Sequence, residues 1–363
     1  MQKKIIFFLP NFSQGGAAQS IVKILVYLSN KKNKCELICL KKCFYKKTLL
    51  RNGVKVLEIK SSRTLYSMYR IRNYLLKTSN FYKIYFVSNI NYANILSLIF
   101  LKKIPKIKII TVERTPLQEL NYNYGSMILF FKNFLLKSLI KLLYFKSDLR
   151  IGNSIRVSKD FALFSKTKFI TIYPQSIKMI SKKNISYTKK NLIRIIWVGR
   201  LDKEKSFKTL VDALNFNFNK KIEVSVLGPG NKNLYIKRNY INKNVIFKFY
   251  GYQKNLEKFF LKSDIYIHTA LYEGFPNSVI QAMNYGIPVI SSNSEGGIKE
   301  ITSKGKYATL FKTKNHNELR KILTNYLYSN KTFVKKALLA KKNLQTFNFE
   351  SVLDQYRKKL QSL

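Results

Sequence analysis

The chain has 363 residues, 46% of them hydrophobic, and 67 Lys and Arg face 18 Asp and Glu. A chain this long exceeds the size at which one hydrophobic core keeps growing, so two domains are expected. The opening apolar run Ile5–Leu9 is too short for a secretory signal. No stretch reaches the roughly 20 uncharged apolar residues that span a bilayer. These features exclude a helical membrane protein and predict a cytoplasmic one.

The formal charge of +49 allows two explanations. It is typical of proteins that bind nucleic acid, an anionic membrane or a phosphorylated ligand. Lysine is spread along the whole chain, however, so nucleotide bias in the gene explains the excess equally well. The three cysteines Cys35, Cys39 and Cys43 match neither zinc nor common iron-sulfur spacings. We therefore expect reduced thiols, no metal and no cofactor.

The first half alternates short β-branched runs with segments of helical periodicity. Ala17–Leu28 and Ile90–Leu101 carry apolar residues at helical spacing between such runs. This alternation predicts a parallel sheet covered by helices on both faces. The predicted strands are Lys4–Leu9, Cys35–Leu40, Val54–Ile59, Ile84–Ser88, Ile107–Val112, Leu149–Gly152 and Phe169–Tyr173.

The alternation stops in a polar, lysine-rich stretch and then starts again. We expect an N-terminal Rossmann-like acceptor domain over 1–180, a linker over 181–191, a C-terminal Rossmann-like donor domain over 192–345, and a last helix in 346–363 that packs back on the first domain. The two halves should face each other across a cleft. The second set of predicted strands is Ile193–Gly199, Ile222–Leu227, Val245–Phe249, Ile265–Thr269 and Pro288–Ser291, with helices at Ser206–Leu214, Leu256–Leu261, Asn277–Tyr285 and Ser351–Leu360.

Ligands of open α/β sheets bind beyond the carboxyl ends of the strands, so the residues that follow each strand are the candidates for chemistry. Gly15 and Gly16 follow the first strand and open a helix. Adjacent glycines let a ligand approach the backbone, and a helix start favours an anion, although a glycine pair that merely tightens the connection is as common. The pattern lacks G-x-G-x-x-G, and the second strand ends in Leu40-Lys41-Lys42 without an acidic residue. A nicotinamide dehydrogenase is therefore disfavoured.

Two further segments follow strands of the second half. Gly199 and Arg200 end the first of these strands, and Lys205 stands at the next helix start. A guanidinium and an ammonium near one point suit a diphosphate leaving group, whereas a solvated charged loop is the alternative. Gly228 and Gly230 form another glycine turn after a strand.

The most informative segment runs from Glu273 to Ser278. A carboxylate follows a strand, Gly274 brings backbone close to a ligand, and Pro276 with Asn277 and Ser278 begins a helix whose amides face the same point. Since the chain has only 18 acidic residues, a Glu at this place points to a function.

At this point the sequence resembles the family 4 glycosyltransferases of the GT-B type, which consist of two Rossmann-like α/β domains. The resemblance runs nearly end to end, and its order and spacing are more specific than any single motif. It rests on Gly15-Gly16, Asn153-Ser154, Gly199-Arg200 with Lys205, Gly228 and Gly230, Asp264, Glu273-Gly274-Phe275-Pro276, Ala282-Met283, Gly286-Ile287-Pro288-Val289, and Gly296-Gly297 with Glu300.

The resemblance implies roles for these positions. Arg200 and Lys205 would neutralise the donor diphosphate, and Glu273 would hold hydroxyls of the transferred sugar. Glu113 and Arg114 stand where relatives often place a polar residue of the catalytic face. The residues implied in donor binding are Gly15, Gly16, Gly199, Gly228, Gly274, Phe275, Pro276, Asn277, Ser278 and Gln281.

Gln281 is a departure from the family pattern, which has a second Glu there to accept from ribose hydroxyls. A carboxamide offers one acceptor oxygen and two donors, so donor binding should weaken by about 1 kcal/mol. No Asp-x-Asp occurs in the sequence, and the cations would replace a metal clamp on the diphosphate. The family implies transfer with retention, by front-face attack.

The resemblance also implies the partners: a nucleotide-sugar and a glycan or lipid-linked acceptor, with no nucleic acid. Met127–Phe145 is the most apolar segment, and its lysines do not fall on one helical face. A mostly buried helix of the first domain is the preferred interpretation. Peripheral attachment to an anionic membrane at the inner face of the cell membrane stays a hypothesis, because basic residues near such a surface contribute about 1 kcal/mol each.

Two rival functions remain open. A sugar-nucleotide epimerase or hydrolase could use the same fold. A nucleic-acid-binding protein would fit the charge and the 24 Tyr and 26 Phe, but these aromatics lie at strand and apolar helix positions, which favours core packing.

Overall fold

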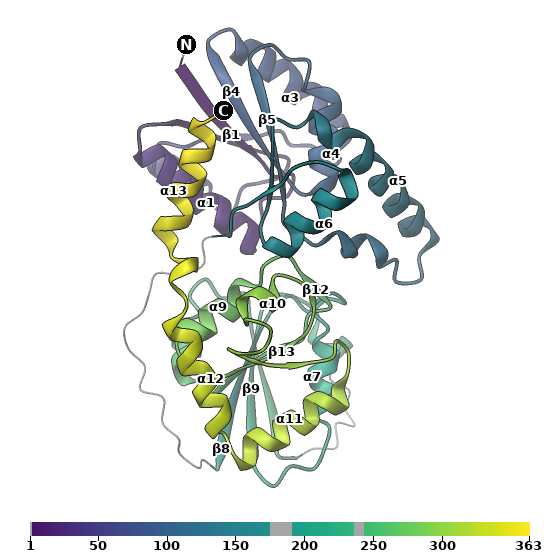
Figure 1. The fold of residues 1–363 in the computed structure, drawn as a ribbon, viewed down its shortest axis with the longest axis vertical. Coiled ribbons are helices and arrows are strands. Elements are labelled where there is room, and N and C mark those ends of the chain that lie inside the picture. Colours follow the sequence, from purple (N-terminus) through teal and green to yellow (C-terminus); the bar gives the residue numbers. More distant parts are fainter. Residues whose placement is uncertain (1, 175–190, 236–242) are drawn as a thin grey trace. The chain divides into compact units, whose positions relative to one another are not determined.

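The computed structural model describes residues 2–174, 191–235 and 243–363. The chain divides into two compact units, Met1–Gln175 with Phe349–Leu363, and Ser176–Asn348 (Figure 1). The first unit thus ends close to the expected boundary at 180. Almost all of the expected linker 181–191 lies outside the described residues.

The first unit contains one parallel seven-stranded sheet of order β3-β2-β1-β4-β5-β6-β7. The strand predictions for this half are confirmed, with the last one reduced to two residues. All three cysteines of this unit are buried and free. The strands are β1 (Gln2–Phe8), β2 (Lys34–Cys39), β3 (Lys55–Glu58), β4 (Tyr82–Asn89), β5 (Ile107–Glu113), β6 (Leu149–Gly152) and β7 (Ile170–Thr171).

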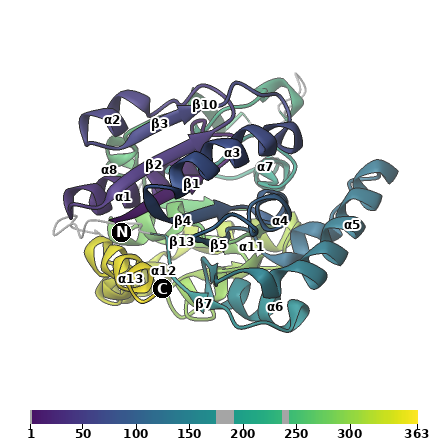
Figure 2. The same ribbon diagram turned by 90° about the horizontal axis from the view of Figure 1, so that it is seen from above.

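Side chains of β1 alternate between two cores, as a strand's period of two requires. Ile5 and Phe7 enter one buried cluster and Ile6 and Phe8 the other. Helices cover both faces of the sheet (Figure 2), which explains why its strands are apolar on both sides. The helices of this unit are α1 (Gly16–Asn30), α2 (Lys46–Arg51), α3 (Thr64–Ser79), α4 (Asn91–Phe100), α5 (Met127–Leu143), α6 (Ile155–Ser165) and α13 (Phe349–Gln361).

The C-terminal helix α13 belongs to the first unit and lies beside α1 (Figure 1). Val352, Leu353, Tyr356 and Leu360 form one buried stripe that joins the core of α1. This spacing places them on one face of the helix, and burial of that stripe holds the chain end on the first sheet.

The second unit contains a parallel six-stranded sheet of order β10-β9-β8-β11-β13-β15 and a separate short pair, β12 with β14. Trp197 and Phe207 lie at the centre of its core, with ring centroids 4.8 Å apart. The strands are β8 (Leu192–Val198), β9 (Lys221–Leu227), β10 (Val245–Gly251), β11 (Ile265–His268), β12 (Tyr272–Glu273), β13 (Val289–Ser292), β14 (Glu295–Gly296) and β15 (Thr309–Phe311). The helices are α7 (Phe207–Leu214), α8 (Glu257–Lys262), α9 (Asn277–Asn284), α10 (Ile298–Ile301), α11 (His316–Tyr328) and α12 (Lys331–Lys342).

The expectation that Met127–Phe145 forms a mostly buried helix is wrong. Only Asn133 and Ile140 of α5 are buried, because one face of the helix packs on α4 and α6 and the rest lies at the edge of the unit (Figure 2). The exposed apolar side chains are Met127, Ile128, Phe130, Phe131, Phe134, Leu135 and Leu142, with Phe145 just beyond. In the described part of the chain, no helix has both the length and the hydropathy to cross a bilayer.

Candidate functional site

The site predicted in the second half lies at a topological switch point. The chain builds β8, β9 and β10 outward in one direction and then returns to β11 on the other side of β8. Loops diverge at the carboxyl ends of such neighbouring strands and leave room for a ligand. Arg200 follows β8 and Glu273 follows β11, so the topology accounts for their meeting.

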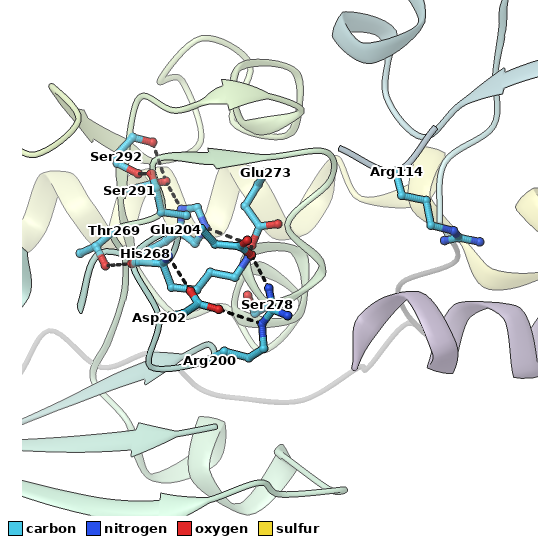
Figure 3. Close-up of polar contacts among 12 residues, drawn as sticks. Arg114, Arg200, Asp202, Glu204, His268, Thr269, Glu273, Ser278, Ser291 and Ser292 are labelled. Carbon is cyan, nitrogen blue, oxygen red and sulfur yellow. Dashed lines mark hydrogen bonds and ion pairs between the residues drawn. The ribbon is translucent and has the colours of Figure 1, made fainter. Parts of the chain in front are cut away.

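Five charged side chains converge at this point (Figure 3). Lys205 Nζ lies 2.5 Å from Glu273 Oε1 and 2.9 Å from Glu204 Oε1. Arg200 Nη2 lies 2.7 Å from Glu204 Oε1, and its Nε lies 3.0 Å from Asp202 Oδ2. The structure therefore brings together the two predicted cations, Arg200 and Lys205, and the predicted carboxylate of Glu273. It adds two carboxylates, Asp202 and Glu204, that sequence reasoning missed although they stand between Arg200 and Lys205.

The charges of Lys205 and Glu273 stabilise each other. Burial by itself would raise the pKa of Glu273, but the ammonium of Lys205 and the neighbouring His268 lower it to about 2. Burial would likewise lower the pKa of Lys205, and the carboxylates of Glu273 and Glu204 hold it above its ordinary value. Both groups are consequently charged at neutral pH.

His268 is a third residue that sequence reasoning missed, because a histidine at the end of a strand usually has a structural role. Its Nε2 lies 3.9 Å from Glu273 Oε1, and its Nδ1 lies 3.0 Å from Ser291 Oγ. Nearby, Thr269 Oγ1 donates to the carbonyl of Lys205 over 2.7 Å and accepts from Trp197 Nε1 over 3.0 Å. The end of β11 thus positions both partners of the ion pair.

A glycine pair fixes the backbone of Glu273. Strand β12 pairs with β14 so that Glu273 lies opposite Gly296. Gly296 has φ +107°, and a Cβ there would lie 1.7 Å from the carbonyl oxygen of Glu273. The amide of Gly297 donates to the carbonyls of Glu273 (3.2 Å) and Gly274 (3.0 Å). Only glycine fits at position 296, which gives a physical reason for a motif that the sequence showed without a role.

The segment after Glu273 begins α9. Phe275 is buried with its ring 5.4 Å from that of Phe347, and Pro276 is the N-cap residue, without a side-chain cap. Ser278 Oγ accepts from Tyr266 Oη over 2.7 Å. Gln281 lies one turn after Ser278 and is partly exposed. The uncapped helix start is the kind of site where an anion is stabilised.

The glycines after β8 and β9 pack against each other. Gly228 has φ +142°, and a Cβ there would lie 1.8 Å from the carbonyl oxygen of Gly199. The amide of Gly228 donates to the carbonyl of Gly251 over 2.8 Å. A Cβ on Gly199 would approach Lys205 Cγ to 3.3 Å. Both glycines therefore have a packing role, and donor binding by them stays a prediction.

The remaining predicted residues lie in the first unit. Gly15 is the N-cap residue of α1, which Gly16 begins, and a Cβ on Gly15 would meet nothing within 4 Å. Glu113 ends β5 and is fully buried. Its carboxyl therefore does not lie on an exposed face of the unit, where a catalytic-face residue would be expected. Burial raises the pKa of Glu113 to about 8. Its carboxyl accepts from Tyr144 Oη, and from Asn94 Nδ2 over 2.6 Å.

No group of three or more His, Cys, Asp or Glu with metal-binding geometry occurs in the ranges that the structure describes. Arg200 is the more exposed of the two cations in the charged cluster, and the start of α9 is a second place that favours an anion.

Two doubly wound parallel α/β units, with cations and a carboxylate at a switch point, define the GT-B class of fold. A family model described as Glycosyl transferases group 1 matches residues 177–342. The matched residues take up most of the second unit and slightly less than half of the chain.

Two curated relatives match parts of the chain. The protein CapJ of Staphylococcus aureus is 28% identical over 149 residues, which are 40% of this chain and 37% of CapJ. A Campylobacter jejuni enzyme, N-acetylgalactosamine-N,N'-diacetylbacillosaminyl-diphospho-undecaprenol 4-alpha-N-acetylgalactosaminyltransferase, is 24% identical over 230 residues, 61% of this chain and 62% of the relative. The chain thus matches less than two thirds of the length of either relative.

Solved structures match over the entire chain. HepE of Anabaena, determined with UDP and glucose, has a TM-score of 0.78 at 19% identity and full coverage of both chains. Sucrose-phosphate synthase of Thermosynechococcus elongatus has a TM-score of 0.79 at 14% identity, also with full coverage of both. These matches show that the fold is GT-B.

Proposed function

We propose that this protein transfers a sugar from a nucleotide-sugar donor to a glycan or lipid-linked acceptor. The observation that carries the proposal is the cluster of Arg200, Lys205 and Glu273 at the switch point of the second sheet. The match to the group 1 glycosyl transferase model over the same unit supports it. So does the likeness to HepE, a protein of the same fold that was determined with UDP and glucose.

The two cations differ in how firmly they are held. The side chain of Arg200 is 58% exposed, whereas that of Lys205 is 15% exposed. Exposed ion pairs contribute about 0–1 kcal/mol, so Arg200 can leave its carboxylates for a diphosphate at little cost. Lys205 stays with Glu273 and orients its carboxylate toward the sugar.

In the proposed reaction, the bond between the anomeric carbon and the donor phosphate oxygen breaks. The acceptor hydroxyl oxygen forms the new bond on the same face, and its proton passes to the departing phosphate, so that configuration is retained. Negative charge grows on the phosphate beside Arg200 and positive charge grows on the sugar ring beside Glu273, and both residues thereby stabilise the transition state. With cations in this place, we propose that the reaction is independent of metal.

The test is sugar transfer from UDP-, GDP- and ADP-sugars, with and without EDTA. Arg200→Gln should lower turnover by at least roughly a hundredfold, and EDTA should have no effect. Arg194→Gln, at the opposite end of β8, is the matched control and should leave turnover unchanged. Near-normal transfer by the Arg200 variant would refute the proposal.

Product analysis separates the rival functions. An altered or hydrolysed sugar nucleotide formed without an acceptor would indicate an epimerase or hydrolase on this fold. Salt-sensitive affinity for nucleic acid, without binding of any nucleotide-sugar, would favour a nucleic-acid-binding protein.

We also propose that the protein attaches to an anionic membrane through α5. The helix has three lysines and no acidic residue. At about 100° per residue, Lys132 and Lys137 flank the exposed apolar stripe on opposite sides, and Lys141 lies just inside the edge next to Lys137. The lysines need not share one face, because long basic side chains at both edges reach the headgroups while the stripe enters the acyl boundary.

Flotation with liposomes at physiological salt tests this attachment. The protein should float with phosphatidylglycerol-containing vesicles and much less with pure phosphatidylcholine. Phe131→Asp with Phe134→Asp should abolish flotation, since both side chains are more than 60% exposed on the stripe. Phe81→Asp, at an exposed site outside α5, is the control. A wild-type protein that stays in solution would refute attachment.

A further inference from the structure

The first sheet has a switch point of its own. The chain builds β1, β2 and β3 in one direction and returns to β4 on the other side of β1. Three polar residues stand at the carboxyl ends of the strands on that side: Asn89 closes β4, Arg114 follows β5 and Asn153 follows β6. Ligands of open α/β sheets bind at such a place, and nothing in the second unit's cluster involves these residues.

Two neutral carboxamides hold Arg114 in place. Its Nε donates to Asn89 Oδ1 over 2.8 Å, and its carbonyl accepts from Asn153 Nδ2 over 2.8 Å. Asn89 is itself fixed, because its Nδ2 donates to the carbonyl of Phe8 at the end of β1 over 3.2 Å. The guanidinium is thus positioned at the switch point by groups that leave its charge intact.

Arg114 lacks a counter-charge. In the described part of the chain, no carboxylate lies within ion-pair distance of it, whereas Lys4 is paired with Glu36 at 2.6 Å and Lys205 with Glu273 at 2.5 Å. Its Nη2 is buried without a hydrogen-bond partner, and so is Asn153 Oδ1. Burial lowers the pKa of Arg114, and Tyr356 of α13 partly offsets this.

Unsatisfied buried polar atoms of this kind are uncommon in folded proteins, and a bound ion is one of the explanations for them. An unpaired guanidinium that carboxamides hold in place offers its free fork to an oxyanion, which it can bind in bidentate fashion. At the same edge, the open backbone at Gly15 and the start of the fifteen-residue helix α1 favour negative charge as well.

We propose that Arg114 binds an oxyanion carried by the acceptor, a phosphate or carboxylate group on the glycan or on its lipid anchor. This inference rests on the proposed sugar transfer. The donor diphosphate has its own cations in Arg200 and Lys205 of the second unit, and Arg114 gives the first unit a separate anion site.

Binding to the full chain, measured by calorimetry, tests the inference. The probes are farnesyl diphosphate, farnesol, inorganic pyrophosphate, glucuronate and UDP. Arg114→Gln should weaken binding of farnesyl diphosphate at least roughly tenfold, as expected for the loss of a charge-assisted hydrogen bond, and leave UDP binding within twofold. Arg70→Gln, an exposed arginine of the same unit, should change neither. Arg200→Gln should show the reverse pattern and lose UDP.

The different probes identify the chemical group that supplies the oxyanion. Dependence of pyrophosphate binding on Arg114 would identify a phosphate, and dependence of glucuronate binding would identify a carboxylate. Loss of UDP binding in Arg114→Gln, or equal binding of farnesyl diphosphate and farnesol by the wild type, would overturn the inference. Failure of the wild type to bind or use any nucleotide-sugar would overturn the proposed function instead.

Asn89→Asp keeps the assignment testable if Arg114→Gln does not fold. The carboxylate has the shape of the carboxamide and supplies the counter-charge that Arg114 lacks. It should therefore raise the thermal midpoint while weakening binding of farnesyl diphosphate at least roughly tenfold. A purely structural Arg114 would gain stability without any loss of binding.

Discussion

The cations at the switch points of the two units differ in the groups that surround them. In the second unit, Arg200 and Lys205 face three carboxylates, whereas in the first unit Arg114 is held by carboxamides alone. A paired cluster stabilises the buried ammonium of Lys205 and fixes the position of the Glu273 carboxylate. A guanidinium held by neutral groups keeps its charge for a ligand. The same residue type therefore has different functions according to the groups that hold it.

Breaking the paired cluster should give the largest effect. Glu273→Gln removes the carboxylate from Lys205, whose side chain is only 15% exposed, and it removes the group that we propose to face the sugar. Turnover should fall by at least roughly a hundredfold, as measured by sugar transfer at saturating donor. Asp212→Asn breaks the exposed pair with Lys208 on α7 and should be nearly neutral. Similar activities of the two variants would contradict a special role for Glu273.

A smaller effect is expected from disturbing the backbone that positions this cluster. Gly296→Ala would place a methyl group 1.7 Å from the carbonyl of Glu273, and the loop must move. Donor affinity should fall at least roughly tenfold, because displacement of a positioned group by about 1 Å can cost a hundredfold in rate. Gly125→Ala has a similar positive φ of +82° but open space around the added methyl. Equal donor affinities, measured by calorimetry, would remove the positioning role of Gly296.

A third prediction concerns the pH dependence of folding stability, to which Glu113, the residue before Arg114, contributes. The pKa of Glu113 rises from 4.5 to about 8 on folding, so the folded state retains a proton that the unfolded state loses. Wild-type stability should then decrease with rising pH between about 4.5 and 8, by up to about 1.4 kcal/mol per pH unit. Glu113→Gln removes this dependence. Denaturant unfolding at pH 5, 6, 7 and 8 measures it, and parallel curves for the two proteins would contradict it.

The smallest effect is expected at Gln281 on α9. Gln281→Glu restores the second carboxylate of the family pattern and should strengthen nucleoside diphosphate binding by about 1 kcal/mol, or roughly fivefold. The gain should vanish for a 2′,3′-dideoxy nucleotide, which lacks the hydroxyls that a carboxylate would accept from. An equal gain for both nucleotides would show that Gln281 does not face the ribose, and a loss of activity would mark Gln281 as an adaptation.

The positions of the strands along the chain, and the residues that follow each strand, could be predicted because both depend on local patterns. Runs of β-branched residues and helical periodicity define the two sheets, and the rule for open α/β sheets then places Arg200 and Glu273 at the same edge. The contribution of Asp202, Glu204 and His268 could not be predicted. Charged loop residues usually lie in solvent, and a histidine in a strand usually packs in the core.

For α5, the composition established an apolar helix with scattered lysines, but which side faces the sheet depends on the packing of α4 and α6. Hydrophobicity alone therefore predicted burial, whereas most of the helix is exposed. The sequence could not show this, because the neighbours that pack on α5 come together only in the folded unit.

Two glutamates mark the limit of what the sequence determines. Glu113 and Glu273 both follow or end a predicted strand, and the sequence determined by itself that each stands at the carboxyl edge of a parallel sheet. Only the tertiary structure decided that Glu273 has Lys205 at 2.5 Å and a pKa of about 2, while Glu113 has Tyr144 and Asn94 and a pKa of about 8. The ionisation of a buried carboxyl depends on the charge and hydrogen bonds around it, and distant parts of the chain supply these only after folding.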